Sequence, residues 1–475
     1  MGRTLRRIIS VLPAVAIQVL VLLALIKWLS PYAAVINLIL SILSILLVLY
    51  IIIKREETAY RTLWLLVILS FPVAGALLYL LFGNRRTARP LAKRLEKSVP
   101  KEKPNNTAIM KLMHEQNPRL AQTFEYVHRK SGFPVMANEG AKYYPLGDDM
   151  FPDMLEDLRS AEKFIYVEYF IIHHGVMFDS IVDILKEKVR EGVDVRVMYD
   201  DLGSISTFSW RDQRELTEQG IRCVAFNPML AIGGTLNYRV ERFGHWKDIG
   251  FRITGKTAQS FTEMFLQFWN AFADWTPEET NFTPPEQDEI KEVPDGYVLS
   301  YCDSPISPEA VSNNLYIDLL SLAVDYAWFY TPYLTPGDAL LEAMIRAAQR
   351  GVDVRIIIPG IPDKKVIFRL SHSYCKTLMD SGVKIYEYTP GFLHAKACIV
   401  DGVVGTVGTV NLDYRSLFLH FENNSLFYGA SLLRDLKKDF DNTLSLCTEL
   451  EPYDKKKYMR RWLFDGILRI FAPLC

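Results

Sequence analysis

The sequence has little of what marks several common protein classes. It has six cysteines in 475 residues, and none forms a CxxC pair, so neither a zinc site nor a disulfide framework is indicated. The net charge is only −1, which argues against a chain that binds nucleic acid through overall positive charge. Hydrophobic residues make up 49% of the chain and charged residues 23%, so a disordered or collagen-like chain is excluded.

Apolar residues are concentrated near the N-terminus. Three apolar stretches cover about residues 8–29, 33–53 and 63–82, and each is close to the ~20 residues that a helix needs to cross a bilayer. The first stretch starts with arginines, as a signal peptide can, but it has no small-residue cleavage site and two further stretches follow. Residues 1–83 are therefore predicted to form a retained module of transmembrane helices.

A basic segment follows the apolar stretches. Residues 85–103 contain eight lysines and arginines against two glutamates. Positive charge beside membrane spans marks the cytoplasmic side and favours contact with anionic lipid headgroups. We therefore expect a multi-pass protein of the cell membrane whose later domains face the cytoplasm, with residues 84–133 as a basic linker. The loop 54–61 and the N-terminus are also basic, and three full spans cannot place all of these basic segments in the cytoplasm. Either one span is re-entrant or interfacial, or the less strongly basic segments do not determine the orientation.

The rest of the chain contains an internal repeat. The pentapeptide GVDVR occurs at Gly192–Arg196 and at Gly351–Arg355, each time after an amphipathic helical pattern and at the start of a β-type run. One strand is predicted before each of these helices, at 164–172 and at 327–334. Another strand is predicted after each pentapeptide, at 220–228 and at 382–390. The matched order of elements predicts two related α/β lobes with mainly parallel sheets.

The repeat also sets the expected domain bounds. We expect the first lobe over residues 134–282, the second over 283–450, and a basic amphipathic tail over 451–475. A basic helix with an aromatic face either lies at the lipid headgroup boundary or packs on the second lobe, and the sequence favours neither.

Reactive side chains follow the second copy of the repeat. After Pro390 the chain reads GFLHAKACIVDG, in which His394, Lys396 and Asp401 form an HxKxxxxD pattern. The strand period places His394, Lys396 and Cys398 on one face. An imidazole can attack or protonate a phosphodiester, an ammonium neutralises phosphate oxygens, and a carboxylate can orient the histidine. HxK alone also fits a solvated polar strand, so the residues after Asp401 are needed to distinguish a catalytic box from such a strand.

The stretch from Gly405 to Gly429 makes the pattern specific. It contains Gly408-Thr409-Val410-Asn411, Asp413-Tyr414-Arg415-Ser416 and Phe421-Glu422. Together with the HxKxxxxD box, these motifs make the chain similar to the bacterial cardiolipin synthases of the phospholipase D superfamily. The resemblance extends over nearly the whole chain, through segments 71–86, 143–158, 167–172 and 331–336.

The resemblance implies a function. Members of the family convert two phosphatidylglycerol molecules into cardiolipin and glycerol through a phosphatidyl-histidine intermediate, without a metal or nucleotide cofactor, and hydrolysis by water is the alternative chemistry. The implied partners are phosphatidylglycerol and cardiolipin in the membrane, and no nucleic acid. The implied site consists of the catalytic His394, Lys396 and Asp401 with Asn411, Ser416 and Glu422, of which Lys396 and Asn411 would bind phosphate, while Asp401 and Glu422 would orient histidines.

The family has one box in each lobe, and the first box is missing here. Its lead-in, Asn237-Tyr238-Arg239, is present, but the chain soon reaches Gly244-His245-Trp246-Lys247-Asp248, which in the family comes only after the box and a further loop. The sequence reads as if the first HxKxxxxD strand and the following hairpin had been removed in frame. We therefore expect a gap in the first sheet, where backbone groups lose their partners.

The other histidines do not replace the missing box. His245-Trp246-Lys247 and His128-Arg129-Lys130 lack the aspartate and are expected to be structural or surface residues. The rest have no lysine two residues on and are expected at the surface or in packing, although His420 lies in the motif-rich stretch and can line the site. These residues are His114, His173, His174, His372 and His420.

Three hypotheses stay open because one histidine cannot be both nucleophile and general acid for the same leaving group. General acid catalysis alone contributes ~10²–10⁴-fold. The first hypothesis is an impaired synthase in which two chains pair as a homodimer to share a site. The second is an inactive lipid-binding or regulatory relative that pairs with an intact synthase. The third is a damaged copy of a normal synthase.

Overall fold

The structure is a computed structural model of the 475-residue chain. It describes residues 16–21, 23, 33–54, 57–83, 105–204, 206–226, 245–272, 294–305, 307, 309–451 and 462–474. Most of the first apolar stretch, the basic segment 85–103 and the lead-in 237–239 lie outside the described residues.

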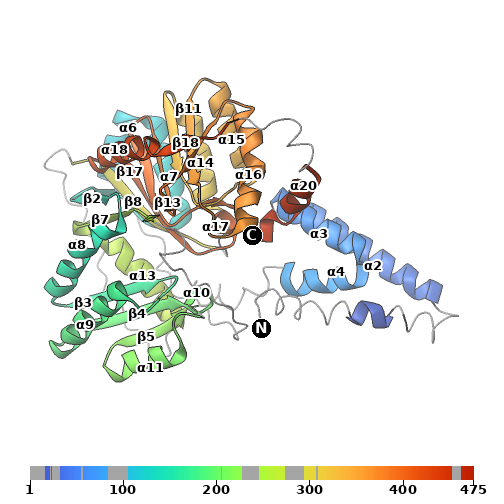
Figure 1. Cartoon of the computed structure of the whole chain (residues 1–475), viewed down its shortest axis with the longest axis horizontal. Coiled ribbons are helices and arrows are strands. Elements are labelled where there is room, and N and C mark those ends of the chain that lie inside the picture. Colours follow the sequence, from blue (N-terminus) through green and yellow to red (C-terminus); the bar gives the residue numbers. More distant parts are fainter. Residues whose placement is uncertain are drawn as a thin grey trace.

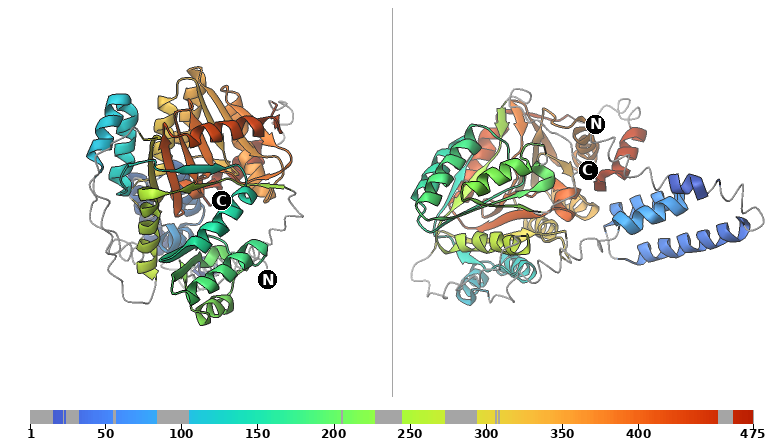
Figure 2. Two further views of the ribbon diagram at one scale, coloured as in Figure 1. Left: turned by 90° about the vertical axis from the view of Figure 1, so that its left-hand side faces the viewer. Right: turned by 90° about the horizontal axis from the view of Figure 1, so that it is seen from below.

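Three helices and a short π-helical turn form the N-terminal module. They are α2 (Ala33–Ile53), α3 (Thr58–Ser70), α4 (Pro72–Leu78) and η1 (Tyr79–Gly83). Figures 1 and 2 show α2 extending away from the two lobes. Within the described ranges, none of the helices meets the length and hydropathy needed to cross a bilayer. The three transmembrane spans therefore stay a prediction.

Part of the expected linker is folded. Residues 107–131 form two helices, α6 (Thr107–Gln116) and α7 (Pro118–Ser131), whose N-termini are capped by the side chains of Asn106 and Asn117. Their apolar faces are buried in the core of the second lobe, so residues 105–133 belong to that lobe and are not a linker. The sequence interpretation followed the run of positive charge and overlooked this helical pattern.

The second lobe is built on a nine-stranded sheet in the order β1-β8-β17-β15-β14-β9-β11-β12-β18. Strands β9, β11 and β12 are parallel, and the other pairs are antiparallel. The strands are β1 (Met136–Ala137), β8 (Tyr297–Asp303), β9 (Tyr326–Tyr330), β11 (Asp353–Pro359), β12 (Lys384–Tyr388), β14 (Ala397–Val400), β15 (Val404–Gly408), β17 (Glu422–Tyr428) and β18 (Cys447–Glu449).

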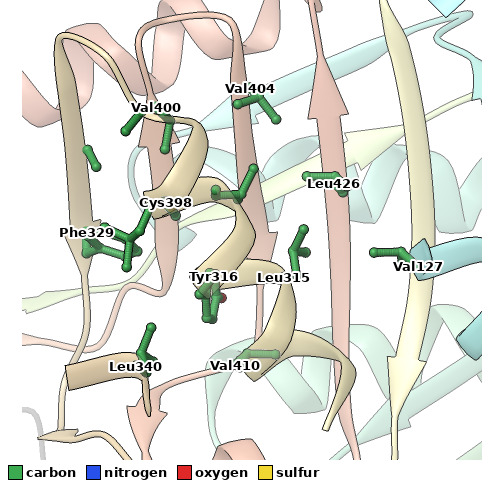
Figure 3. Packing of buried hydrophobic residues seen from close by; sticks show 14 of the residues in the cluster. Val127, Leu315, Tyr316, Phe329, Leu340, Cys398, Val400, Val404, Val410 and Leu426 are labelled. Atoms are coloured by element: carbon green, nitrogen blue, oxygen red, sulfur yellow. The ribbon is translucent and has the colours of Figure 1, made fainter. Parts of the chain in front are cut away.

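Helices cover both faces of this sheet. One face packs against α6, α7, α14 (Val311–Leu322), α15 (Asp338–Gln349) and α16 (Lys365–Met379), and the other against α18 (Leu432–Leu444). Figure 3 shows Leu315 and Tyr316 of α14 against Phe329, Cys398 and Leu426 of the sheet. Two short strands, β10 (Leu334–Thr335) and β16 (Leu412–Asp413), pair nearby, and α17 (Tyr414–Phe418) follows them.

The first lobe contains the same elements in two separate sheets. Strands β3 (Phe164–Tyr169), β4 (Asp194–Asp200) and β5 (Arg222–Phe226) form a parallel sheet, and β2 (Ala141–Tyr144) pairs with β7 (Gly250–Ile253). The helices of this lobe are α8 (Gly147–Ser160), α9 (Val176–Arg190), α10 (Asp201–Ser204), α11 (Trp210–Glu218) and α13 (Ala258–Phe272), with the turn η3 (Gly255–Thr257).

The division of the first sheet fits the segment missing from the sequence. In the second lobe, β14 and β15 join the β9–β11–β12 group to the β8–β17 pair, and the HxKxxxxD box lies at β14. Among the described residues of the first lobe, no strand takes their place, so β3 pairs with β4 alone. Residues 227–244, where the box strand of this lobe would lie, are outside the described part, so the gap in the first sheet stays a prediction.

The repeated pentapeptide has the same structural role in both lobes. Arg196 pairs with Asp194 at 2.7 Å, and its guanidinium lies 5.0 Å from the centroid of the Tyr166 ring on the neighbouring strand. Arg355 pairs with Asp353 at 2.7 Å and lies 4.5 Å from the Trp328 ring. Each arginine is thus held by an aspartate two residues earlier and by an aromatic ring at its cross-strand position.

The C-terminal tail packs on the second lobe in its described part. Helix α20 (Trp462–Ile470) contacts α16 and α3, and the turn η4 (Ala472–Leu474) contacts α3 and α17. An ion pair of 3.0 Å joins Asp465 to Arg369. Leu463 and Phe464 stay exposed, and residues 452–461 lie outside the described part.

Candidate active site

The backbone at the HxKxxxxD box is held by the first lobe. Strand β13 (Gly391–Leu393) pairs in parallel with β6 (His245–Lys247), and the N–H of His394 donates to the carbonyl of Lys247 at 2.7 Å. The chain then leaves the ladder until β14 begins at Ala397. His394 and Lys396 therefore lie in a break between two strands, and the continuous strand expected from 394 to 398 is not formed.

His394 is oriented by a carboxylate from the first lobe. Its Nδ1 lies 2.8 Å from Oδ2 of Asp248 and 2.8 Å from Nζ of Lys396. Asp248 can only accept, so the neutral ring that satisfies it carries the proton on Nδ1. In this tautomer Nε2 keeps a free lone pair, and 33% of the side chain faces solvent. The arrangement presents a nucleophilic nitrogen at the seam between the lobes.

Local charges favour a neutral His394. Desolvation lowers the pKa of His394, the positive charge of Lys396 lowers it further, and the negative charge of Asp248 opposes both. Burial raises the pKa of Asp248, but its contact with His394 and the positive charge of Lys396 outweigh burial and leave that pKa below its usual value. The site therefore combines an ionised carboxylate with an unprotonated imidazole near neutral pH.

Lys396 is the most deeply placed cation of this group. Its side chain is buried, and its Nζ also donates to the carbonyl oxygen of His394. Desolvation lowers the pKa of Lys396, while the charges of Asp248, Glu422 and Asp413 act in the opposite direction. An ammonium fixed beside the histidine can neutralise the oxygens of a phosphate that His394 attacks.

Asp401 has a different position from the one expected. It adopts a left-handed conformation with φ of 50°, and its carboxylate accepts hydrogen bonds of 2.7–2.8 Å from the backbone N–H groups of Val324, Asp325 and Tyr326. The structure thus uses Asp401 to fix the turn after β14, whereas Asp248 contacts the histidine. The role of orienting His394, assigned to Asp401 from the sequence, passes to Asp248.

The remaining predicted residues form a connected group beside the box. The hydroxyl of Ser416 donates to Oε1 of Glu422 at 2.7 Å and accepts from the backbone N–H of Asn411 at 2.9 Å. Thr409 donates to the other oxygen of Glu422. Because the buried Ser416 hydroxyl is engaged on both sides, it holds this loop in place. Asn411 and Glu422 are thus joined through the Ser416 hydroxyl, in the segment of chain that follows the box.

Sequence reasoning did not identify Asp248 as a site residue. Its Gly-x-Trp-x-Asp segment was recognised as a first-lobe strand, but Asp248 and His394 are 146 residues apart in the chain. Spacing gives no information about such a contact, and only the related positions of two lobes could have pointed to it. Trp246 adds to this contact, with its ring centroid 5.3 Å from that of His394.

The two incomplete HxK sequences have structural roles, as predicted. Lys247 is buried and forms an ion pair of 2.9 Å with Asp439 of α18, which also accepts from the hydroxyl of Tyr143 at 2.8 Å. In the other sequence, Nδ1 of His128 lies 2.8 Å from the carbonyl of Phe133 at the end of α7.

Family models match two parts of the chain. The model described as cardiolipin synthase, PLD-like domain, matches residues 316–444, and the model described as phospholipase D-nuclease N-terminal matches residues 42–84. A solved structure of phosphatidylserine synthase from Haemophilus influenzae has a TM-score of 0.56 at 15% identity, covering 74% of this chain and 100% of that chain. This last likeness concerns the fold.

Curated relatives match over most of the chain. A protein of Streptococcus mutans without an assigned function is 39% identical, with 90% of this chain and 99% of the relative covered. A cardiolipin synthase from Geobacillus sp. is 30% identical, with 100% of both chains covered. Cardiolipin synthase 2 from Bacillus cereus is 30% identical over 89% of this chain and 88% of its own. The chain belongs to the cardiolipin synthase family, whose HxKxxxxD box it carries at His394, Lys396 and Asp401.

Proposed function

We propose that the protein transfers a phosphatidyl group from one phosphatidylglycerol to another, which yields cardiolipin and glycerol. The observation that carries this proposal is the contact of His394 with Asp248 and Lys396. It combines a neutral nucleophile, a carboxylate that orients it and a cation for phosphate at one exposed point. The relatives named cardiolipin synthase suggest the product, and the family resemblance implies phosphatidylglycerol as the substrate.

The residues suggest how the first half of the reaction proceeds. Nε2 of His394 attacks the phosphorus, the Nε2–P bond forms, and the bond from phosphorus to the departing glycerol oxygen breaks. Lys396 neutralises the phosphate oxygens, and Asp248 stabilises the positive charge that develops on the ring. A second lipid then attacks the phosphatidyl-histidine and releases His394. Because the substrates are anionic lipids, we expect these steps to take place at a membrane.

The missing first box predicts an impaired enzyme. The alignment with the Geobacillus relative spans 514 positions against 475 residues here, so at least 39 of its positions have no residue from this chain. This supports a deleted segment. Because Asp248 and β6 of the same chain contact the box, a site within one chain fits better than a homodimer that shares two second lobes.

The test is lipid synthesis by the purified full-length chain. It is incubated with phosphatidylglycerol vesicles, and the products are identified by mass spectrometry beside H394A and the control H372Q. His372 also pairs with a carboxylate, Glu387 at 2.7 Å, but on α16 away from the box. We expect cardiolipin from the wild type and from H372Q and none from H394A. Phosphatidic acid in place of cardiolipin would indicate hydrolysis.

A different outcome would favour the alternative function. If the wild type binds the vesicles but forms neither cardiolipin nor phosphatidic acid, the protein is an inactive lipid-binding relative, and an intact synthase becomes its expected partner. Vesicles of neutral phosphatidylcholine serve as the control for charge-dependent binding.

A further inference from the structure

A second histidine–carboxylate pair lies beside the HxKxxxxD box. Nδ1 of His420 is 3.4 Å from Oε1 of Glu422, and the His420 side chain is 27% exposed. On the other side of the ring, Nε of Arg415 donates to Nε2 of His420 at 2.5 Å. As in the Asp248–His394 pair, a carboxylate meets Nδ1, so Nε2 is the atom that faces outward from the pair.

The neighbours of His420 come from the first lobe. Its ring centroid is 5.8 Å from that of Phe170, which directly follows the open strand β3. The next residue, Phe421, packs edge-to-face against Phe226 and Phe268 of the first lobe at 5.1 and 5.2 Å. These aromatic contacts hold His420 at the seam, beside the edge of β3 that pairs with no other strand among the described residues.

The sheet register brings the carboxylate of this pair to the same face as Lys396. Ala397 pairs with Val407, and Gly408 pairs with Asn424, so Lys396 and Glu422 project from one face with only β15 between their strands. The charge of Glu422 is close enough to raise the pKa of Lys396. The two histidine–carboxylate pairs therefore border one cluster of charged groups.

We propose that His420 supplies the general acid and base when His394 acts as the nucleophile, and so takes the place of the second box histidine that this chain lacks, with Glu422 as the carboxylate that orients it. This inference rests on the proposed phosphatidyl transfer and adds a residue to it. The protonated His420 gives its Nε2 proton to the glycerol oxygen as the P–O bond breaks, which releases neutral glycerol. The neutral ring then takes the proton from the hydroxyl of the incoming lipid as that oxygen attacks phosphorus and the Nε2–P bond of His394 breaks.

Arg415 has a defined part in this scheme. Its guanidinium occupies Nε2 of His420 in the structure, and arginine cannot give up its charge. A phosphodiester offers the guanidinium a negatively charged acceptor, which makes a stronger hydrogen bond than a neutral imidazole does. Substrate binding then frees Nε2 of His420 for proton transfer.

The test compares two leaving groups in full-length H420Q, H420N, H394A, H372Q and wild type. Glycerol leaves phosphatidylglycerol only with a proton, whereas nitrophenolate leaves phosphatidyl-p-nitrophenol as a stable anion. We expect H420Q to lose about 10²–10⁴-fold in cardiolipin formation from phosphatidylglycerol. With the nitrophenyl ester it should release one equivalent of nitrophenolate rapidly and then stall, because no base activates the second lipid.

The stalled variant gives a signal that a purely structural role would not give. Phosphatidyl-His394 should accumulate in H420Q and be found by peptide mass spectrometry, H394A should show neither the burst nor the adduct, and H372Q should match the wild type. Thermal melting of H420Q and H420N identifies variants that fail to fold.

The outcomes separate this inference from the proposed function. If the wild type is active and H420Q and H420N match it, His420 has no part in proton transfer and the inference fails alone. If folded H420Q and H420N both lose the nitrophenolate burst, the inference also fails. Both variants would then be defective in the attack on phosphorus, as H394A is, and not in proton transfer alone. A wild type inactive on both lipids overturns the proposed function and the role of His420 together.

Discussion

Asp248 of the first lobe contacts Nδ1 of His394 in the second lobe at 2.8 Å, and this contact spans the seam between the lobes. The first lobe, whose sequence contains no HxKxxxxD box, therefore contacts the box of the second lobe directly. It supplies the orienting carboxylate, and its strand β6 fixes the backbone of β13 directly before His394. Removing the whole first lobe would be expected to do more harm than removing its box.

Replacing Asp248 should lower activity and shift its pH dependence. D248N keeps the shape of the side chain but removes the charge, so we expect roughly a 10²–10⁴-fold loss of kcat/KM for cardiolipin formation. The negative charge of Asp248 raises the pKa of His394, so its removal lowers that pKa. Attack needs the neutral ring, and the acidic limb of the pH–rate profile should therefore move to lower pH.

Surface variant D153N is the matched control, because Asp153 pairs with Lys142 in the same lobe but outside the cluster. An acidic limb that stays in place in D248N would contradict the assigned contact.

Replacing Lys396 should shift the same limb in the opposite direction. K396M removes a positive charge that lowers the pKa of His394, so that pKa rises and the acidic limb moves to higher pH. Activity should fall on the order of 10²–10³-fold because phosphate oxygens lose their cation. NMR titration of the His394 ring measures the pKa without turnover, and K376M on α16 is the control. Shifts of the same sign in K396M and D248N would refute this electrostatic account.

Replacing Asp401 should affect stability more than catalysis. D401A leaves three backbone N–H groups without their acceptor and places alanine at a φ of 50°, so the free energy of unfolding should fall by about 1–3 kcal/mol. D401N should lose less, because asparagine tolerates the left-handed region and keeps one oxygen. Urea denaturation measures the loss. A large fall in kcat with unchanged stability would instead return Asp401 to the reaction.

The buried ion pair between Lys247 and Asp439 should join the two lobes energetically. K247M leaves the Asp439 carboxylate buried with the hydroxyls of Tyr143 and Tyr330, so we expect a loss of about 3–5 kcal/mol in the free energy of unfolding. The double variant K247M/D439L should recover much of that loss, because no uncompensated charge remains. Denaturation of both single variants and the double variant forms a cycle, and additive losses would argue against the pairing.

Local patterns predicted the repeated parts of the fold well. Helices α9 and α15 precede the repeated pentapeptide and strands β4 and β11 begin within it, as expected, and β5 and β12 lie within 220–228 and 382–390. Amphipathic periods and glycine turns are local signals, so the sequence predicts these elements. The internal repeat also predicts a gap in the first sheet, because the position of the second box shows what the sequence of the first lobe lacks.

Long-range contacts account for what sequence did not predict. The break at His394 arises because β13 pairs with β6 of the other lobe, and nothing in residues 391–400 encodes that partner. Asp401 looked like a partner of the histidine by its place in the box, yet its φ and its three amide contacts make it part of a turn. Helices α6 and α7 bury their apolar faces against residues nearly two hundred positions later.

The C-terminal end of the described chain packs on the N-terminal helix α3. Helix α20 and the turn η4 contact α3 from the C-terminal side, and η4 also contacts α17, which follows β15 and β16 after the box. Segments from opposite ends of the sequence, α3 and α20, thus lie side by side (Figure 1). A single protease cut between residues 84 and 104 would leave the N-terminal helices attached, and the two fragments would purify together until a denaturant separates them.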